Sequence, residues 1–129
     1  GMEQVSAEVS EGETADVFAT FKSERETSRA NELSYIESVV TSAEVDEATK
    51  SKAQDQKLEL VANMESELLS EGLIETKLGV SAVVAISGES VSVVVDKETL
   101  TDAEVTQIAE IIKTQTDKAS ENIKIMPKA

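Results

Sequence analysis

The sequence predicts an α+β fold with the element order helix-helix-strand-strand-helix-strand, and three observations support this prediction. Residues 14–78 are rich in charge and carry apolar side chains at helical spacing. Residues 80–95 contain two Val-rich runs on either side of a glycine-containing turn, which is the pattern of a hairpin. Residues 101–126 begin with a helix start signal and end with an alternating apolar run. A chain of 129 residues is long enough for one modest hydrophobic core.

The N-terminal part of the chain predicts an arm followed by a long helix. Residues 1–13 are polar and show no period, so we expect a flexible arm. Gly1 in front of Met2 is typical of a remnant of a purification tag. Residues 14–43 predict an extended helix that has apolar ends and a polar middle.

The polar middle of this helix spans residues 22–32 and contains Arg25 and Arg29, which can pair with glutamates of the same helix. A helix that is polar for about three turns cannot bury that part by itself. We therefore expect the helix to protrude from the rest of the chain, and we regard Arg25 and Arg29 as candidate contacts with another protein.

A second helix is expected at the start of the main domain, residues 44–129. Thr41 and Glu44 fit a capping box, which predicts that the helix begins there. Gly72 interrupts the helix and predicts a kink, whereas Gly79 predicts its end, because glycine adopts the left-handed cap conformation without strain. The apolar residues of its second half are Leu58, Val61, Met64, Leu68, Leu69, Leu73 and Ile74.

The hairpin is the strongest local signal in the chain. A two-residue turn at Gly88 and Glu89 joins the two Val-rich runs. The expected cross-strand pairs are Ile86 with Val91, Val84 with Val93, and Ala82 with Val95. This register places all six side chains on one face of the sheet, which supports it.

The last part of the chain predicts a third helix and a third strand. Thr101 and Glu104 form a capping box at the helix start. The expected buried stripe of this helix comprises Val105, Ile108, Ala109 and Ile112. Residues 122–126 alternate between polar and apolar side chains, and Pro127 after them suits the edge of a sheet.

These elements predict a three-stranded sheet that is covered on one face by the second and third helices. The helix between the second and third strands is expected to make a right-handed crossover. We expect the third strand to lie beside the first, which gives the strand order 2-1-3 with the first strand in the centre.

The open face of this sheet is a candidate interface. It holds Val83, Ala85 and Val94, and two covering helices leave nothing obvious to shield them. Such an apolar patch is either shielded by the first helix or used to bind a partner. The candidate interface residues are therefore Val83, Ala85, Val94, Arg25 and Arg29.

The charge and the missing residue types exclude several functions. The net charge of −14, from 26 acidic and 12 basic side chains, repels nucleic acid and anionic membrane surfaces. The absence of Cys and His removes thiol nucleophiles, disulfides, Ser-His-Asp triads and Cys/His zinc sites. No apolar stretch is long enough to span a bilayer. We expect no catalytic residue, no cofactor and no small-molecule substrate.

Two acidic groups allow a chemical interpretation, but each has a simpler one. The first group comprises Glu65, Glu67, Glu71 and Glu75. It suggests either a divalent-metal site or a solvated helix face, and we favour the solvated face because a metal site needs converging ligands. Glu98 and Asp102 suggest an acid/base pair, but their position at a helix start is explained by the helix dipole. We therefore predict no metal site.

The order and spacing of several motifs are similar to those of one protein family. The run ESELLSEGLIETKLGVSAVVAISGESVSVVVDKETLTDAEVTQIAEIIKTQTDKASENIKIMPK resembles the C-terminal domain of the stage III sporulation protein AH family. The upstream run FKSERETSRANELSYIESVVTS resembles the extended N-terminal helix of that family. The resemblance covers residues 17–128.

The resemblance implies a structural role in endospore formation. Members of the family are similar to the ring-building domains of flagellar and type III secretion basal-body proteins. They are anchored in the mother-cell membrane by an N-terminal helix, and their domain lies in the intermembrane space between mother cell and forespore. There they bind forespore membrane protein Q in a channel-like or zipper-like complex. We expect this chain to bind a partner of that type, and a homo-oligomer or ring is a further expectation. The alternative function is a ring or adaptor component of another secretion-type assembly.

Overall fold

The computed structural model describes residues 16–128, so the predicted arm and the tag remnant lie outside the described residues. The helices and strands follow one another in the predicted order. They are α3 (Val17–Val40), α4 (Glu47–Leu78), β1 (Ala82–Ser87), β2 (Ser90–Val95), α5 (Asp102–Thr116), the 3-10 helix η1 (Ser120–Asn122) and β3 (Ile123–Pro127).

The boundary between the two long helices differs from the prediction. Thr41 belongs to the end of α3, where its hydroxyl donates a hydrogen bond of 2.9 Å to the carbonyl oxygen of Glu37. The N-cap of α4 is Asp46, whose carboxylate accepts a hydrogen bond of 2.7 Å from the N–H of Thr49. The predicted start at residues 41–44 is therefore wrong, because Thr41 caps the preceding helix. The helix α4 continues through Gly72 and ends at Gly79, whose φ of 71° confirms the left-handed cap.

The hairpin has the predicted register. Strands β1 and β2 are antiparallel, and Val84 lies opposite Val93. The face that carries these residues packs against α4 and α5 and forms the core of the protein. The buried residues of this core are Ile74, Ala82, Val84, Ile86, Val91, Val93, Val95, Ile108, Ile111 and Ile112.

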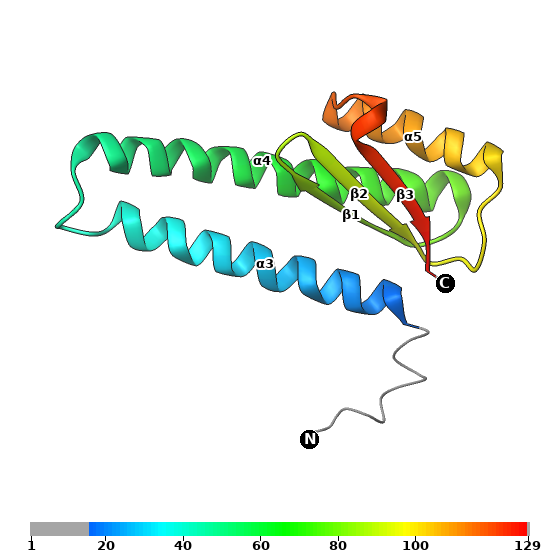
Figure 1. Cartoon of the computed structure of the whole chain (residues 1–129), viewed down its shortest axis with the longest axis horizontal. Coiled ribbons are helices and arrows are strands. Elements are labelled where there is room, and N and C mark those ends of the chain that lie inside the picture. Colours follow the sequence, from blue (N-terminus) through cyan, green and yellow to red (C-terminus); the bar gives the residue numbers. More distant parts are fainter. Residues whose placement is uncertain (1–15, 129) are drawn as a thin grey trace, which may run out of the picture.

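The predicted strand order 2-1-3 is wrong, because the observed order is β1-β2-β3. Strand β3 pairs with β2 in parallel, and α5 makes the crossover between them (Figure 1). A single crossover helix most simply returns the chain to the neighbouring position in the sheet. Apolar content favoured β1 as the central strand, but β1 is an edge strand whose outer side is covered by helices.

The helix α5 begins with the predicted capping box between Thr101 and Glu104. Its buried side chains are those of Ile108, Ile111 and Ile112. Val105, which was expected in the buried stripe, is 36% exposed. Ile111 occupies the buried stripe in its place.

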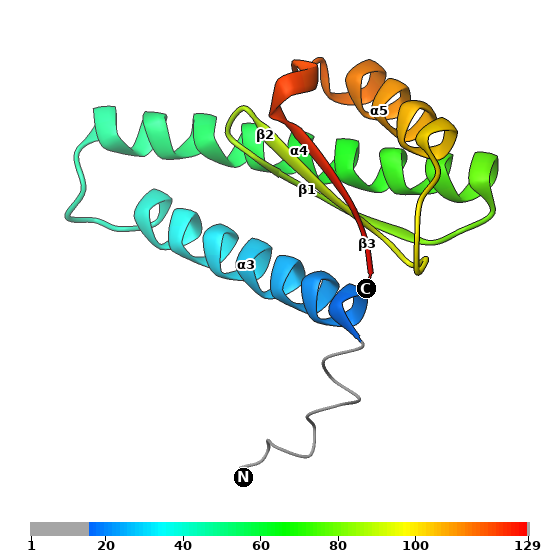
Figure 2. The same cartoon turned by 45° about the vertical axis from the view of Figure 1, so that its right-hand side comes forward.

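The helix α3 does not protrude as predicted. It runs antiparallel to α4 and lies along the β1 edge of the sheet, while α4 and α5 cover one sheet face (Figures 1 and 2). Ile36 of α3 is buried, and Phe18 and Phe21 near its start are half-buried. Within the polar middle of α3, Arg25 is buried and Arg29 is half-buried, whereas the rest of residues 22–32 is exposed. These two charged side chains therefore need partners beside the sheet.

Candidate interaction surfaces

Two charged pairs from α3 and α4 close the outer edge of β1. Arg25 forms an ion pair with Glu71. A guanidinium nitrogen of Arg25 also donates a hydrogen bond of 2.7 Å to the carbonyl oxygen of Val84. The N–H of Val84 donates a hydrogen bond of 2.9 Å to the Glu71 carboxylate. The backbone of Val84 is therefore bound on both its N–H and its C=O by one ion pair.

The same arrangement is repeated two residues further along β1. Arg29 forms an ion pair with Glu67 and donates a hydrogen bond of 2.9 Å to the carbonyl oxygen of Ile86. The N–H of Ile86 donates a hydrogen bond of 2.8 Å to the Glu67 carboxylate. We call Arg25, Arg29, Glu67 and Glu71 the edge clamp, because together they take the place of a neighbouring strand.

The spacing of the edge clamp follows from elementary geometry. Four residues of an α-helix rise by about 6 Å. Two residues of a strand span about 6.7 Å. Arginines four residues apart on α3 and glutamates four residues apart on α4 can therefore match alternate residues of β1. From Val84 to Ile86, the residue number of the bound arginine increases from 25 to 29, whereas that of the bound glutamate decreases from 71 to 67. The two orders are opposite because α3 and α4 run in opposite directions.

The edge clamp is buried, which increases the strength of its charge interactions. The exposed fraction of the side chain is 7% for Arg25 and 2% for Glu67. Burial disfavours the charge of Arg29, but the hydrogen bond and the attraction from Glu67 outweigh it, with help from Glu32, so that the pKa of Arg29 is raised. Arg29 therefore stays charged in this position, where it donates a hydrogen bond to the carbonyl oxygen of Ile86.

The structure changes the interpretation of the candidate interface on the open sheet face. Val83 and Val94 are each only 1% exposed, so their expected exposure is wrong. The helix α3 contacts both β1 and β2, so it shields these residues, and shielding by this helix was one of the two possibilities left open by the sequence. Ala85 is half-buried on the same face. Arg25 is buried as well, so in the isolated chain these residues hold α3 on the sheet, and their role as an interface stays a prediction.

Glu67 and Glu71 were missed as functional residues because the sequence analysis assigned them to a solvated helix face. A signal was present in the sequence, since the two glutamates have the same spacing of four as Arg25 and Arg29. That signal becomes specific only when both pairs are placed beside one strand. Among residues 16–128, no group of three or more acidic side chains is arranged to hold a metal ion.

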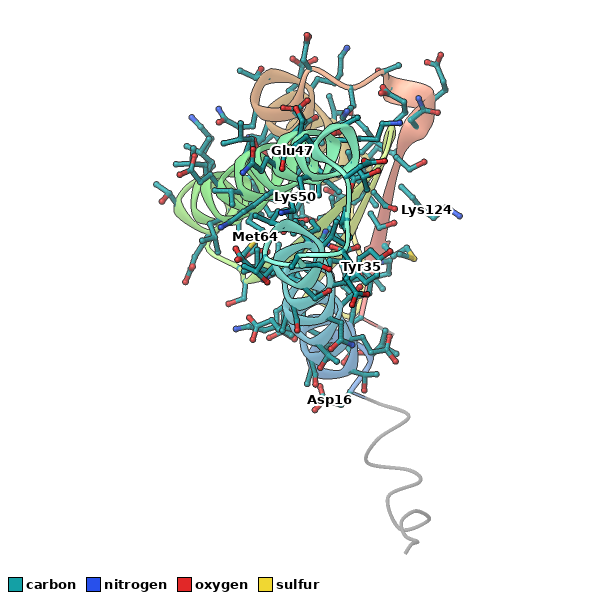
Figure 3. The ribbon with its side chains drawn as sticks, turned by 90° about the vertical axis from the view of Figure 1, so that its left-hand side faces the viewer. Asp16, Tyr35, Glu47, Lys50, Met64 and Lys124 are labelled. Carbon is teal, nitrogen blue, oxygen red and sulfur yellow. The ribbon has the colours of Figure 1, made fainter. Side chains whose placement is uncertain are left out.

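Two other surfaces are open in the described part of the chain. One is an apolar stripe on α4 whose large residues are 40% to 71% exposed; it comprises Leu58, Val61, Leu68 and Leu69. The other is the outer edge of β3. Figure 3 shows the Lys124 side chain of β3 pointing away from α4 and α5.

Comparisons with known proteins agree on one family. The family described as SpoIIIAH-like protein matches residues 2–125 of the chain. A chain in a solved structure, described as the SpoIIQ-SpoIIIAH pore forming complex, is 26% identical with a TM-score of 0.71. The match covers 87% of this chain and 98% of that chain. No curated protein sequence matches this chain.

Proposed function

The chain belongs to the SpoIIIAH-like family, and we propose that it is a structural component of the channel complex between mother cell and forespore in endospore formation. It acts by binding a SpoIIQ-type partner through protein–protein contacts. The observation that carries this proposal is the match of almost the whole fold to a chain of the SpoIIQ-SpoIIIAH pore forming complex. The match extends over 87% of the chain, so it takes in at least part of α3.

The proposed role needs no catalytic residue. The most deeply buried charged side chains of the described residues are Arg25 and Glu67. Both are bound to the backbone of β1, as are Arg29 and Glu71, so these groups serve to hold α3 on the sheet. Buried charges that are paired and hydrogen-bonded in this way are typical of a structural role.

The proposed location is the space between the two membranes, with the full-length protein held in the mother-cell membrane by an N-terminal helix. The family membership and the described complex support this location. None of the helices within residues 16–128 is long and apolar enough to cross a bilayer. The test is the gene sequence upstream of Met2, where we expect an apolar segment of about 20 residues.

The binding function is tested by a calorimetric titration of this chain with the soluble domain of the SpoIIQ-type protein from the same genome. We expect saturable binding that an unrelated acidic protein of similar size does not reproduce. The acidic control is necessary because the net charge of −14 alone gives a nonspecific electrostatic response. Absence of binding by the folded chain would contradict the proposed function. Binding to a component of another secretion-type assembly, with none to the SpoIIQ-type domain, would favour the alternative.

A further inference from the structure

The apolar stripe of α4 interrupts a helix face that is otherwise polar. Its large side chains are 40% to 71% exposed. Steps of three and four residues along the same face lead back from Leu58 to Gln54, Ser51 and Glu47, which are exposed and polar. A solvated helix face is normally polar along its whole length. The change from polar to apolar residues at Leu58 therefore indicates a surface that contacts another molecule.

A hollow of about 320 Å³ lies between this stripe and α3, and the residues that line it all belong to these two helices. Ala30 and Leu33 line it from α3, and Met64 and Leu68 line it from α4. Figure 3 shows Met64 on the opposite side of the helix pair from Lys124. A cavity of about 150 Å³ holds a benzene ring, so the hollow has room for a large apolar side chain. We call the hollow and the apolar stripe together the back groove.

Gly72 extends the back groove, because it lies on the same helix face four residues after Leu68. A glycine inside a helix costs about 1 kcal/mol relative to alanine. A Cβ atom at Gly72 would meet no atom within 4 Å, so packing within residues 16–128 does not require a glycine there. Glycine also allows the backbone of another molecule to approach closely. Gly72 therefore favours a partner that crosses α4 at this position.

The shape of the back groove fits a helix. The backbone groups of α3 and α4 are bound within these helices, so they offer no edge to which a strand could be added. Recognition therefore depends on side chains, as it does when an amphipathic helix lies in a groove. From Leu58 to Gly72 the back groove is about 21 Å long, which matches a helix of about 14 residues.

The charges of the back groove require a basic partner. Glu65 lies within the apolar stripe and is exposed. Glu26 lines the hollow and is 61% exposed, although a guanidinium nitrogen of Arg25 lies 3.6 Å from its carboxylate. Burial of Glu65 without a cation would be costly. A partner therefore needs a basic side chain opposite Glu65, and additional basic side chains complement the net charge of −14.

The same charges disfavour the other possible occupants. A two-fold pair of back grooves centred on Glu65 would set this carboxylate opposite itself, and like charges in contact are destabilising. Residues 1–15 contain glutamates and no basic residue, so they are repelled as well. An anionic membrane surface is repelled by the net charge, and insertion of the stripe into lipid would bury Glu65 without a partner.

We propose that the back groove binds an amphipathic helix of another protein, with basic residues beside its apolar stripe and one aromatic side chain that enters the hollow. An aromatic ring fits there because Arg25 and Arg29 also line the hollow, and guanidinium groups attract the faces of aromatic rings. The binding goes beyond the proposed function. It uses only α3 and α4 and does not depend on the SpoIIQ-type partner.

The first test uses a synthetic peptide of about 18 residues that contains Lys, Leu in a helical stripe, and one central Trp. Because the chain has no Trp, the fluorescence of the peptide reports its binding. We expect this peptide to bind at least about tenfold more tightly than a scrambled peptide of the same composition, and than a peptide with Glu in place of Lys. Equal binding of the scrambled peptide would indicate a nonspecific charge effect and overturn the proposal. The titration needs no SpoIIQ-type domain, so its outcome is independent of the proposed function.

The second test locates the peptide on the chain with variants at exposed positions. We expect Leu68→Asp to weaken binding by about tenfold. Tyr35→Asp is the matched control, because Tyr35 is 69% exposed, compared with 61% for Leu68, and lies on the opposite side of the helix pair from Met64 (Figure 3). It should change binding by less than about twofold. Equal effects of the two variants would overturn the proposal.

A third variant tests the close approach at Gly72. Gly72→Gln should raise the melting temperature of the free chain, because glutamine has the higher helix propensity, and should weaken binding because its side chain fills the back groove. Unchanged binding of the peptide by Gly72→Gln would overturn the proposal. Loss of a dimer of the free chain with Leu68→Asp, at unchanged peptide binding, would assign the back groove to self-association and overturn it too.

Discussion

Arg29 and Glu67 bind the same backbone residue, Ile86, from two different helices. Arg29 donates to its carbonyl oxygen, Glu67 accepts from its N–H, and the two side chains pair with each other. An edge strand normally exposes both groups to solvent or to another strand. In this protein one ion pair satisfies both, and the neighbouring pair of Arg25 and Glu71 does the same for Val84.

The first prediction concerns the energy of the edge clamp. Arg29→Met leaves the buried carboxylate of Glu67 with only the longer ion pair of 3.9 Å to Arg25. We expect a loss of about 3 kcal/mol in the free energy of unfolding, as for other broken buried pairs. Lys57→Met breaks an ion pair with Glu37 whose side chains are 44% and 43% exposed. We expect this control to cost less than about 1 kcal/mol. The measurement is urea denaturation of each variant.

A double-mutant cycle measures the interaction energy between Arg29 and Glu67 apart from the effect of removing each side chain alone. Glu67→Gln keeps an acceptor for the N–H of Ile86 and removes the buried charge. We therefore expect Arg29→Met with Glu67→Gln to be more stable than Arg29→Met alone. Additive losses in the double variant would show that Arg29 and Glu67 do not act as a pair.

The second prediction reverses an expectation from the sequence. The sequence placed Val83 on an open sheet face, but Val83 is 1% exposed beneath α3. A carboxylate there is desolvated without a partner, so we expect a loss of several kcal/mol and a much lower melting temperature. Ser90→Glu adds the same charge at an exposed position of β2 and should melt near the parent. Equal melting temperatures of Val83→Glu and the parent would show that α3 does not cover the sheet face.

Local patterns in the sequence predicted most of the fold. The Val-rich runs predicted the register of β1 and β2 because side chains alternate along a strand, and Gly79 and Thr101 predicted a helix end and a helix start. The order of the strands was not predictable in this way, because it depends on where a crossover returns to the sheet. Apolar content suggested a central position for β1, although helices cover its outer edge.

The site was harder to predict than the fold, because its contacts join residues far apart in the chain. Arg25 and Glu71 are 46 positions apart, and Arg29 and Glu67 are 38 apart. Each of these charged residues, taken alone, is typical of a solvated helix face. Only the placement of two antiparallel helices beside β1 turns the matched spacing into a site.

The third prediction concerns the division of the chain at residues 43 and 44, which stays a proposal. Deleting residues 1–43 removes both arginines of the edge clamp and exposes Val83 and Val94. We expect residues 44–129 to unfold cooperatively but at a lower temperature, because Glu67 and Glu71 lose their partners. Glu67→Gln with Glu71→Gln in the truncated chain should recover part of the loss. Loss of the cooperative transition on deletion would show that α3 belongs to the core domain.

The fourth prediction concerns pH. A hydrogen bond of 2.6 Å from Lys97, together with the N–H of Thr101, lowers the pKa of Glu104 from its ordinary value of 4.5. A lowered pKa in the folded state means that Glu104 stabilises the protein above that ordinary value and loses this effect as the pH falls through the folded-state pKa. The difference in melting temperature between the parent and Glu104→Gln should therefore be largest near pH 7 and shrink below about pH 4.5. A difference that stays constant down to about pH 3 would contradict this assignment, and Glu110→Gln on the same helix serves as the control.

Hydrogen exchange of two backbone amides tests most directly the claim that charged side chains of α3 and α4 satisfy the outer edge of β1. In the free protein we expect slow exchange at Val84 and Ile86, whose N–H groups donate to Glu71 and Glu67. Fast exchange at Val84 and Ile86 in the free protein, at the rate of exposed amides, would contradict the account.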